Sequence, residues 1–312
     1  MNDERLAVLD VGSNSLRLFC CEGMDADGPR GARYTLVVGL RRGAGPDGSL
    51  DERALARLAA ALDLWSERLR RFSPARTVAV CTSAVRDAPN RVRVLDLLER
   101  RVGPRCHVLS GEQEAGLAFA GASLAVGDRR EITVVDVGGG STELVSGAAG
   151  VRRAAVSLQL GAVRQTELRL ASDPPSAAEL ARVSADVQDV CVPVRAALGG
   201  FGYPIAVAGT ATGLAAIDLG GYNPRRVHRH RLSRRRVGEL LALLVDLPTE
   251  RRRTLPGLQP QRADVITAGA AILAGVLDVM GADEVMVSER DLLDGVAMAS
   301  LGALGDTYQF LR

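Results

Sequence analysis

Blocks of apolar and polar residues predict strands and helices in turn along the chain. Residues 6–11 and 16–21 are short apolar runs of strand length, and the GSNS between them predicts a hairpin with a tight glycine turn. In residues 49–72, apolar side chains recur at steps of three and four, which is the spacing of one helix face. Because strand and helix blocks keep alternating to the end of the chain, the pattern predicts an α/β protein.

The other elements follow from the same two periodicities. Ser49 and Glu52 predict a capping box at the start of the helix at 49–72, and Ser233 predicts the cap of a helix at 233–247. Segment 204–217 reads as a strand, a loop and a helix. Further strands are expected at 33–41, within 77–90, at 106–110 and at 283–288, and further helices at 91–102, 111–126, 161–170, 176–198, 263–281 and 291–304.

One strand–turn–strand segment occurs twice. VLDVGSNSLRLF, at 8–19, aligns without a gap on VVDVGGGSTELV, at 134–145, with an offset of 126 residues. The repeat indicates two similarly folded halves that face one another, and the alternative is a chance match between two short glycine turns. The aligned pairs are Asp10 with Asp136, Gly12 with Gly138, Ser15 with Ser141 and Leu18 with Leu144.

The second copy of the repeat has the residues of a phosphate site. Gly138, Gly139 and Gly140 leave the backbone open to a ligand, and consecutive N–H groups in such a turn form an anion-binding nest. Ser141 adds a hydroxyl donor. Asp136 would repel a phosphate unless a cation lay between them, so the combination favours a Mg²⁺–phosphate site. The alternative is a plain hairpin with a flexible glycine turn.

The first copy, with Asp10, Gly12, Ser13 and Asn14, predicts a second phosphate cradle, and two cradles would clamp a chain of phosphates.

A general base is available between the two copies. Glu114 lies in the first turn of the helix expected at 111–126, where it could take a proton from an attacking water. The alternative is a surface glutamate that only pairs with the helix dipole.

Composition narrows the chemistry. All 39 basic residues are arginine, which excludes a lysine-containing phosphate loop and Schiff-base catalysis. A net charge of +2 gives no global attraction to nucleic acid, and the basic stretch at 225–236 lacks the aromatic residues that stack on single strands. Five cysteines without a CxxC pair predict a reduced, cytoplasmic protein. The sequence predicts neither a signal peptide nor a membrane span.

Six motifs, in order along nearly the whole chain, resemble those of the exopolyphosphatase and guanosine pentaphosphate phosphatase (Ppx/GppA) family. The resemblance implies the actin, heat-shock chaperone and sugar-kinase superfold, with two ribonuclease-H-like domains and an active cleft between them. It places residues 1–117 and 298–312 in the first domain and 118–297 in the second. The motifs are DVGSNSLRL, TSAVRDAPN, SGEQEA, DVGGGSTEL, GTATGLAAI and RADVITAGAAIL.

The resemblance also assigns roles. Glu114 corresponds to the family's general base, and Asp136 and Glu143 correspond to ligands of Mg²⁺ or Mn²⁺. Gln113 replaces a family glutamate, and DLLDG, with Asp291 and Asp294, departs from the family's commoner GLREG. Phosphate contacts are implied for Asp10, Gly12, Ser13, Asn14, Arg86, Gly138, Gly139, Gly140 and Ser141, and candidate substrate contacts are Arg17, Thr210 and Arg262.

The implied activity is the Mg²⁺-dependent release of terminal phosphate from inorganic polyphosphate by a homodimer, with no nucleic acid or membrane as a partner. Guanosine pentaphosphate is the alternative substrate, since it ends in the same phosphoanhydride. A kinase of the same superfold and a non-catalytic sensor of polyphosphate or an alarmone are two further readings, and Gln113 motivates the sensor.

Overall fold

The chain folds into two compact units, and the computed structural model describes residues 4–103, 106–126, 130–148 and 150–312. The first unit contains Met1–Leu117 and Leu292–Arg312, and the second contains Ala118–Asp291. From the sequence, the chain was predicted to re-enter the first unit at residue 298. The return comes earlier, at Leu292, because α13 (Leu292–Ser300) packs as a whole against the first unit's sheet.

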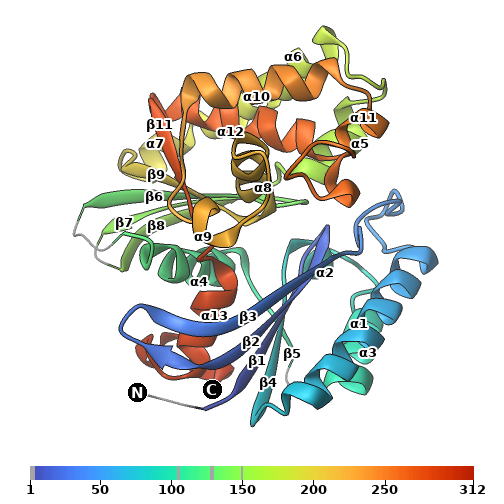
Figure 1. The fold of residues 1–312 in the computed structure, drawn as a ribbon, viewed down its shortest axis with the longest axis vertical. Coiled ribbons are helices and arrows are strands. Elements are labelled where there is room, and N and C mark those ends of the chain that lie inside the picture. Colours follow the sequence, from blue (N-terminus) through green and yellow to red (C-terminus); the bar gives the residue numbers. More distant parts are fainter. Residues whose placement is uncertain (1–3, 104–105, 127–129, 149) are drawn as a thin grey trace. The chain divides into compact units, whose positions relative to one another are not determined.

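The first unit is built on a five-stranded sheet with the order β3–β2–β1–β4–β5 (Figure 1). β1, β2 and β3 form an antiparallel meander, whereas β1, β4 and β5 are parallel. All of β1 is buried, as expected of a central strand covered on both faces. The strands are β1 (Leu6–Val11), β2 (Ser15–Asp25), β3 (Gly28–Val37), β4 (Arg76–Cys81) and β5 (Cys106–Val108).

Helices α1 and α3 cover one face of this sheet and α13 lies on the other (Figure 1). The cap of α1 differs from the prediction. Asp51, not Ser49, is the N-cap, and its Oδ1 accepts a hydrogen bond from the Ala54 amide at 2.5 Å. The helical segments are α1 (Glu52–Phe72), α2 (Ser83–Arg86), α3 (Val92–Val102), α4 (Gly111–Ser123), which continues into the second unit, α13 and the 3₁₀ segment η2 (Gly305–Leu311).

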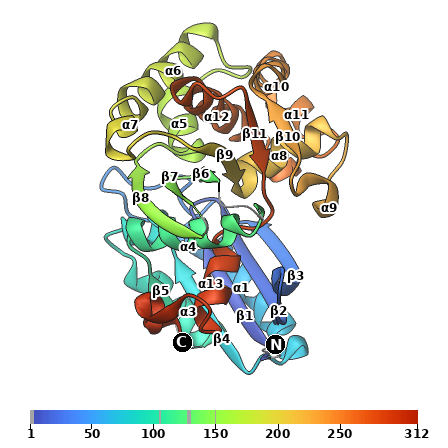
Figure 2. The ribbon, with the colours of Figure 1, turned by 90° about the vertical axis from the view of Figure 1, so that its left-hand side faces the viewer.

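The second unit has a six-stranded sheet with the order β10–β11–β9–β6–β7–β8 (Figure 2). β6, β7 and β8 form an antiparallel meander, β6, β9 and β11 are parallel, and β10 adds an antiparallel edge. The strands are β6 (Glu131–Val137), β7 (Thr142–Ala148), β8 (Val151–Leu158), β9 (Tyr203–Val207), β10 (Arg231–Ser233) and β11 (Glu284–Val287).

The core of the second unit is centred on α12, which is buried along most of its length and packs against α5, α6, α8 and α10. Ser233 caps α10 as predicted, through the Arg236 amide. The helical segments are α5 (Ala162–Arg169), α6 (Ala177–Cys191), α7 (Val194–Ala197), α8 (Ala208–Asp218), α9 (Pro224–Val227), α10 (Arg234–Asp246), α11 (Thr249–Arg252), η1 (Pro260–Arg262) and α12 (Ile266–Met280).

The sequence repeat is a structural repeat. Asp10 pairs with Arg17 across β1 and β2, and Asp136 pairs with Glu143 across β6 and β7, so the two hairpins share one register. In each turn the second residue after the aspartate donates its amide to a carbonyl three residues on, at 3.0 Å. The order β8–β7–β6–β9–β11 also matches β3–β2–β1–β4–β5. The predicted α/β fold with two ribonuclease-H-like units is therefore confirmed.

No helix in the described part of the chain is long and apolar enough to cross a bilayer.

Candidate active site

The glycine loop between β6 and β7 is held from behind by α5. Backbone amides at the start of α5 donate to the carbonyl oxygens of Gly138 and Gly139 at 2.8 to 3.1 Å. Arg164 Nε donates to the carbonyl oxygen of Gly140 at 2.9 Å. The first amides of a helix have no partner within it, and here the loop provides their acceptors. All three glycine carbonyls are thus turned towards α5.

The amides of the same loop therefore point the other way. A trans peptide holds its C=O and N–H groups in opposite directions, so the N–H groups of Gly139, Gly140 and Ser141 face away from α5. None of the three donates a hydrogen bond to another residue that the structure describes. Three successive amides with one orientation form a nest for an anionic oxygen. The loop therefore has the geometry that the sequence led us to expect of a phosphate site.

Gly161 permits this close approach of loop and helix. A Cβ at this position would lie 2.4 Å from the backbone carbon of Gly140 and 2.5 Å from that of Gly139. The φ angle of Gly161 is −136°, which any residue can adopt, so only space requires a glycine here. The sequence pattern predicts only that this glycine begins the helix expected at 161–170, and it indicates no role for it.

Asp136 and Glu143 lie directly opposite one another on adjacent strands, and their side chains therefore share one face of the sheet. Both are buried, with 8% and 2% of their surface exposed. Ser157, opposite Glu143 on β8, donates its hydroxyl to Glu143 Oε1 at 2.7 Å. Like charges placed opposite each other destabilise a sheet, so a cation bound beside these two carboxylates would stabilise the pair.

The matching pair in the first unit has opposite charges. Arg17 binds Asp10 Oδ2 through Nε at 2.8 Å and through Nη2 at 2.7 Å, and the side chains of both residues are largely buried. Arg17 was named as a candidate substrate contact, and Asp10 as part of the phosphate cradle. The structure joins the two in an ion pair, so Asp10 already has a cation beside it.

The donor set at Asp136 and Glu143 fits Mg²⁺ or Mn²⁺. No group of three or more His, Cys, Asp or Glu side chains that could hold a metal occurs among the described residues. Mg²⁺ does not need one, because it retains waters and binds through one or two carboxylates together with substrate phosphates. A zinc site, by contrast, takes three or four protein ligands.

Two further predicted residues lie beside this loop. Thr210 is buried, and its hydroxyl donates to the carbonyl oxygen of Val137 at 3.1 Å, which ties the start of α8 to the end of β6. The guanidinium of Arg262 occupies the space in which a Cβ of Gly209 would lie, so it rests on the first turn of α8. Ala208, which opens α8, has a φ of 62°, an unusual backbone angle for alanine.

The first loop is held in the same manner. The backbone amides of residues 38, 39 and 41 donate to the carbonyl oxygens of Ser13 and Asn14 at 2.8 to 3.0 Å, so the Asn14 amide points away from them. Asn14 Oδ1 is buried and has no hydrogen-bond partner among the described residues. Because buried polar atoms are nearly always paired, this oxygen indicates a place for a bound group. Ser13 Oγ contacts Ser83 Oγ at 3.0 Å.

Arg57 of α1 holds the supporting segment in place. Its Nε donates to the carbonyl oxygen of Val38 at 2.7 Å, and its Nη2 donates to that of Gly39 at 2.9 Å. Arg57 thus acts on the first loop through the backbone, as Arg164 acts directly on the second. Neither arginine was found from the sequence, because both contacts join residues that are distant in the chain.

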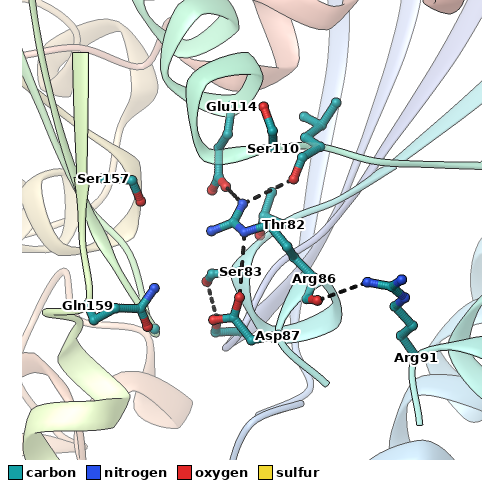
Figure 3. A network of polar contacts seen from close by, with 12 residues as sticks. Thr82, Ser83, Arg86, Asp87, Arg91, Ser110, Glu114, Ser157 and Gln159 are labelled. Atoms are coloured by element: carbon teal, nitrogen blue, oxygen red, sulfur yellow. Dashed lines mark hydrogen bonds and ion pairs between the residues drawn. The ribbon is translucent and has the colours of Figure 1, made fainter. Parts of the chain in front are cut away.

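Glu114 makes an ion pair with Arg86 (Figure 3). Arg86 Nη1 donates to Glu114 Oε2 at 2.7 Å and to the carbonyl oxygen of Leu109 at 3.1 Å. Glu114 lies in the first turn of α4, as predicted, and is only 7% exposed. Arg86 comes from α2, directly after β4. The ion pair holds the carboxylate in one orientation, as a proton acceptor requires.

Gln113 has a structural role of its own. Its side-chain Oε1 accepts a hydrogen bond from the backbone amide of Ser110 at 2.9 Å, and its backbone amide donates to Ser110 Oγ at 3.1 Å. This reciprocal pair is a capping box, in which glutamine serves as well as glutamate. The departure from the family's glutamate therefore leaves the start of α4, and with it the position of Glu114, intact.

The basic stretch at 225–236 is largely paired within the second unit. Its arginines contact acidic side chains of neighbouring elements, as expected for a solvated strand edge and helix face. Four of the seven arginines in the stretch take part in such pairs. They are Arg231 with Glu284, Arg234 with Asp278 and Asp283, Arg235 with Glu239, and Arg236 with Asp218 and Glu239.

Each unit thus collects its own set of predicted residues. The first contains Asp10, Gly12, Ser13, Asn14, Arg17, Arg86 and Glu114, and the second contains Asp136, Gly138, Gly139, Gly140, Ser141, Glu143, Thr210 and Arg262. That the two sets face a common cleft stays a prediction.

Comparisons with known proteins find relatives along nearly the whole chain. The model of the Ppx/GppA phosphatase family matches residues 32–303. Exopolyphosphatase 2 of Mycobacterium tuberculosis is 33% identical, over 96% of this chain and 99% of its own. The crystal structure of the Aquifex aeolicus Ppx/GppA family member is 27% identical, with a TM-score of 0.80 over 97% of this chain and 99% of its own. An exopolyphosphatase from Cytophaga hutchinsonii, 24% identical, shares the fold with a TM-score of 0.87 over 96% and 98%.

Proposed function

The chain belongs to the Ppx/GppA phosphatase family, and on this premise we propose that it hydrolyses the terminal phosphoanhydride bond of inorganic polyphosphate and releases phosphate. The name of the M. tuberculosis relative, which matches over nearly the full length of both chains, supports this substrate. Within the molecule, one observation carries the proposal: the amide nest of Gly139, Gly140 and Ser141 lies in the turn between the paired carboxylates of Asp136 and Glu143.

In the proposed reaction, water attacks the terminal phosphorus and the shortened polyphosphate leaves. Glu114 orients the water and accepts its proton, while Arg86 keeps the carboxylate of Glu114 in place. The loop amides hold the equatorial oxygens of the terminal phosphate, so catalysis is mainly positioning and electrostatic stabilisation. Mg²⁺ or Mn²⁺, when bound to Asp136 and Glu143, would neutralise charge on the phosphate oxygens.

The proposal is tested by phosphate release from short and long polyphosphate, with and without Mg²⁺. Guanosine pentaphosphate and ATP are assayed beside them under the same conditions. We expect Mg²⁺-dependent release from polyphosphate. Release from guanosine pentaphosphate alone would assign the alternative substrate, transfer from ATP to an acceptor would indicate a kinase, and binding without release would indicate a sensor.

Replacing Asp136 by Asn is expected to raise the half-saturating Mg²⁺ concentration at least ~10-fold, because one of two carboxylate ligands is lost. Ser157→Ala is expected to raise it by about 10-fold, because Ser157 orients Glu143. Mn²⁺ binding measured by calorimetry gives a readout independent of turnover. Asp278→Asn, an exposed acid on α12, is the control. Equal Mn²⁺ affinity in all four proteins would place the metal elsewhere.

Gly161→Ala is expected to lower kcat/KM for polyphosphate about 10- to 100-fold, because the new methyl group would displace the glycine loop by about 1 Å. The matched control is Gly238→Ala on α10, where a Cβ meets no atom within 4 Å. That variant should keep full activity and gain about 0.5–1 kcal/mol of stability. The steric argument fails if both variants turn over polyphosphate like the parent protein.

The proposal extends to a cytoplasmic homodimer, on the resemblance to the family and the unpaired cysteines. Light scattering on the purified protein measures the oligomeric state directly.

A further inference from the structure

The thiols of two cysteines are in contact on the strands that precede the segments carrying Arg86 and Glu114. Cys81 is the last residue of β4 and Cys106 is the first residue of β5, and their Sγ atoms lie 3.5 Å apart. The two strands are neighbours in the parallel part of the first sheet. Cys81 is fully buried, whereas Cys106, on the edge strand, is partly exposed.

The other cysteines make no such contact within the described part of the chain. Cys20 and Cys21 are adjacent on β2, so their side chains point to opposite faces of the sheet. Cys191 lies in the core of the second unit, where burial raises its pKa to about 11. All five cysteines are free thiols. Cys81 and Cys106 thus stand apart in their proximity, and Cys106 is the one partly exposed thiol of the five.

Both strands lead directly to the catalytic candidates. After Cys81 the chain enters α2, which ends at Arg86, and after Val108 it passes through Leu109 to α4 and Glu114. The Leu109 amide donates to the carbonyl oxygen of Cys81 at 2.9 Å, and Arg86 binds the carbonyl oxygen of Leu109. Hydrogen-bonded backbone therefore connects the two thiols to the Arg86–Glu114 ion pair.

We propose that Cys81 and Cys106 form an oxidisable dithiol, a modification site at which hydrogen peroxide closes a disulfide and switches off phosphate release. Cys106, the accessible member, loses its thiol proton and attacks peroxide through sulfur; the O–O bond breaks, a sulfenic acid forms, and the leaving hydroxide takes up that proton to become water. The Cys81 sulfur then attacks the sulfenic sulfur, the S–S bond forms and a second water leaves. One peroxide is reduced to two waters, and the two thiols give up two hydrogen atoms.

The order of these steps follows from the environment of each thiol. The hydrogen bond with Cys106 and burial both raise the pKa of Cys81 well above its ordinary value. A thiol of this kind is a poor first nucleophile towards peroxide. Cys81 therefore acts second, as the resolving thiol, on the activated sulfur already beside it.

Closure shortens the distance between the sulfurs from 3.5 Å to about 2.05 Å. Because the two strands are anchored in a packed sheet, the change is accommodated at their ends and in the segments that follow. A displacement of this size at a catalytic group costs about 100-fold in rate. The cross-link itself does not depend on the proposed function, whereas the loss of turnover rests on it.

The test treats the purified full-length protein with hydrogen peroxide and then quenches it with an alkylating agent. Peptide mass mapping is expected to show a Cys81–Cys106 cross-link with the loss of two hydrogen atoms. Polyphosphate turnover is expected to fall about 10- to 100-fold and to recover fully with dithiothreitol. Cys106→Ser should show neither the cross-link nor the reversible loss. Cys191→Ala keeps the dithiol and should respond like the parent protein.

Two results would overturn the proposal. One is a mass map with both thiols alkylated, or with Cys106 carried on to sulfinic acid and no cross-link. The other is a quantitative cross-link that leaves turnover unchanged. If the untreated protein hydrolyses none of the substrates, the proposed function fails, but the mass map still decides whether the disulfide forms.

Discussion

Glu114→Gln is expected to lower kcat for polyphosphate by at least ~100-fold, with little change in thermal stability. Glutamine has the size of glutamate and can still accept a hydrogen bond from Arg86 Nη1 through its side-chain oxygen, so the start of α4 should not move. It cannot take a proton from water. The loss therefore isolates proton transfer from packing, and it should appear in kcat with KM nearly unchanged, because Glu114 is not assigned to substrate binding.

The chain provides a matched control for this variant. Glu112 lies in the same first turn of α4 but is exposed, so Glu112→Gln removes a charge of the same sign from the same helix end. It should retain most of the activity. Turnover of Glu114→Gln close to that of Glu112→Gln would refute the assignment of the base and leave Glu114 as a partner of Arg86 only.

The second large effect is one of stability. Asp294→Ala is expected to lower the free energy of unfolding of the first unit by about 3 kcal/mol. Asp294 is completely buried on α13 and accepts two hydrogen bonds from Arg33 on β3, at 2.8 and 2.5 Å. Arg33 also lies 4.5 Å from the centre of the Phe19 ring. Removing the carboxylate leaves a partly buried guanidinium without its counter-charge.

Two comparison variants separate burial from charge. Glu52→Ala breaks an exposed bidentate pair with Arg93 and should cost far less than Asp294→Ala, because solvent screens an exposed pair. The double variant Arg33→Met with Asp294→Leu replaces the buried pair by apolar side chains and should recover most of the stability. Urea unfolding followed by circular dichroism measures all three. A loss at Asp294→Ala no greater than that at Glu52→Ala would contradict the argument.

The same ion pair explains an unusual motif in the sequence. DLLDG departs from the family's commoner GLREG, and at Asp294 an aspartate stands where the family more often has glutamate. The structure shows Asp294 at the point where α13 packs on the sheet, bound to an arginine far away in sequence. The partner of a buried charge depends on strand order and cannot be predicted from local pattern.

The repeated hairpins could be predicted because each is a local structure. Two apolar runs joined by a short glycine turn specify a hairpin, and the gapless alignment of 8–19 on 134–145 specifies a common register. Glu114 could also be placed in a first helical turn, because its neighbours start a helical pattern. The residues that support the two glycine loops could not be predicted from the sequence, because Arg57, Gly161 and Arg164 act through tertiary contacts.

Several element boundaries were wrong for identifiable reasons. At the start of α1, the N-cap is Asp51 rather than Ser49, because the Asp51 carboxylate accepts from the helix and Ser49 Oγ donates to Asp47 instead. The helix expected at 176–198 ends at Cys191, two residues before Pro193, which has no amide to donate. The loop expected before α8 is absent, because Ala208 turns the chain in one step. β8 was missed because its first half is exposed and carries two arginines.

The Asp10–Arg17 pair has a consequence for how many divalent ions the protein needs. Of the two copies of one hairpin, the first pairs its aspartate with an arginine of the chain, and the second is the copy to which the proposed function assigns Mg²⁺. The expected stoichiometry is therefore one Mg²⁺ per polypeptide, even though the phosphate loop is duplicated. A chelator would remove Mg²⁺ from the second loop and leave the Asp10–Arg17 pair of the first loop unchanged. We therefore expect that substrate binding and substrate hydrolysis can be separated by removing Mg²⁺.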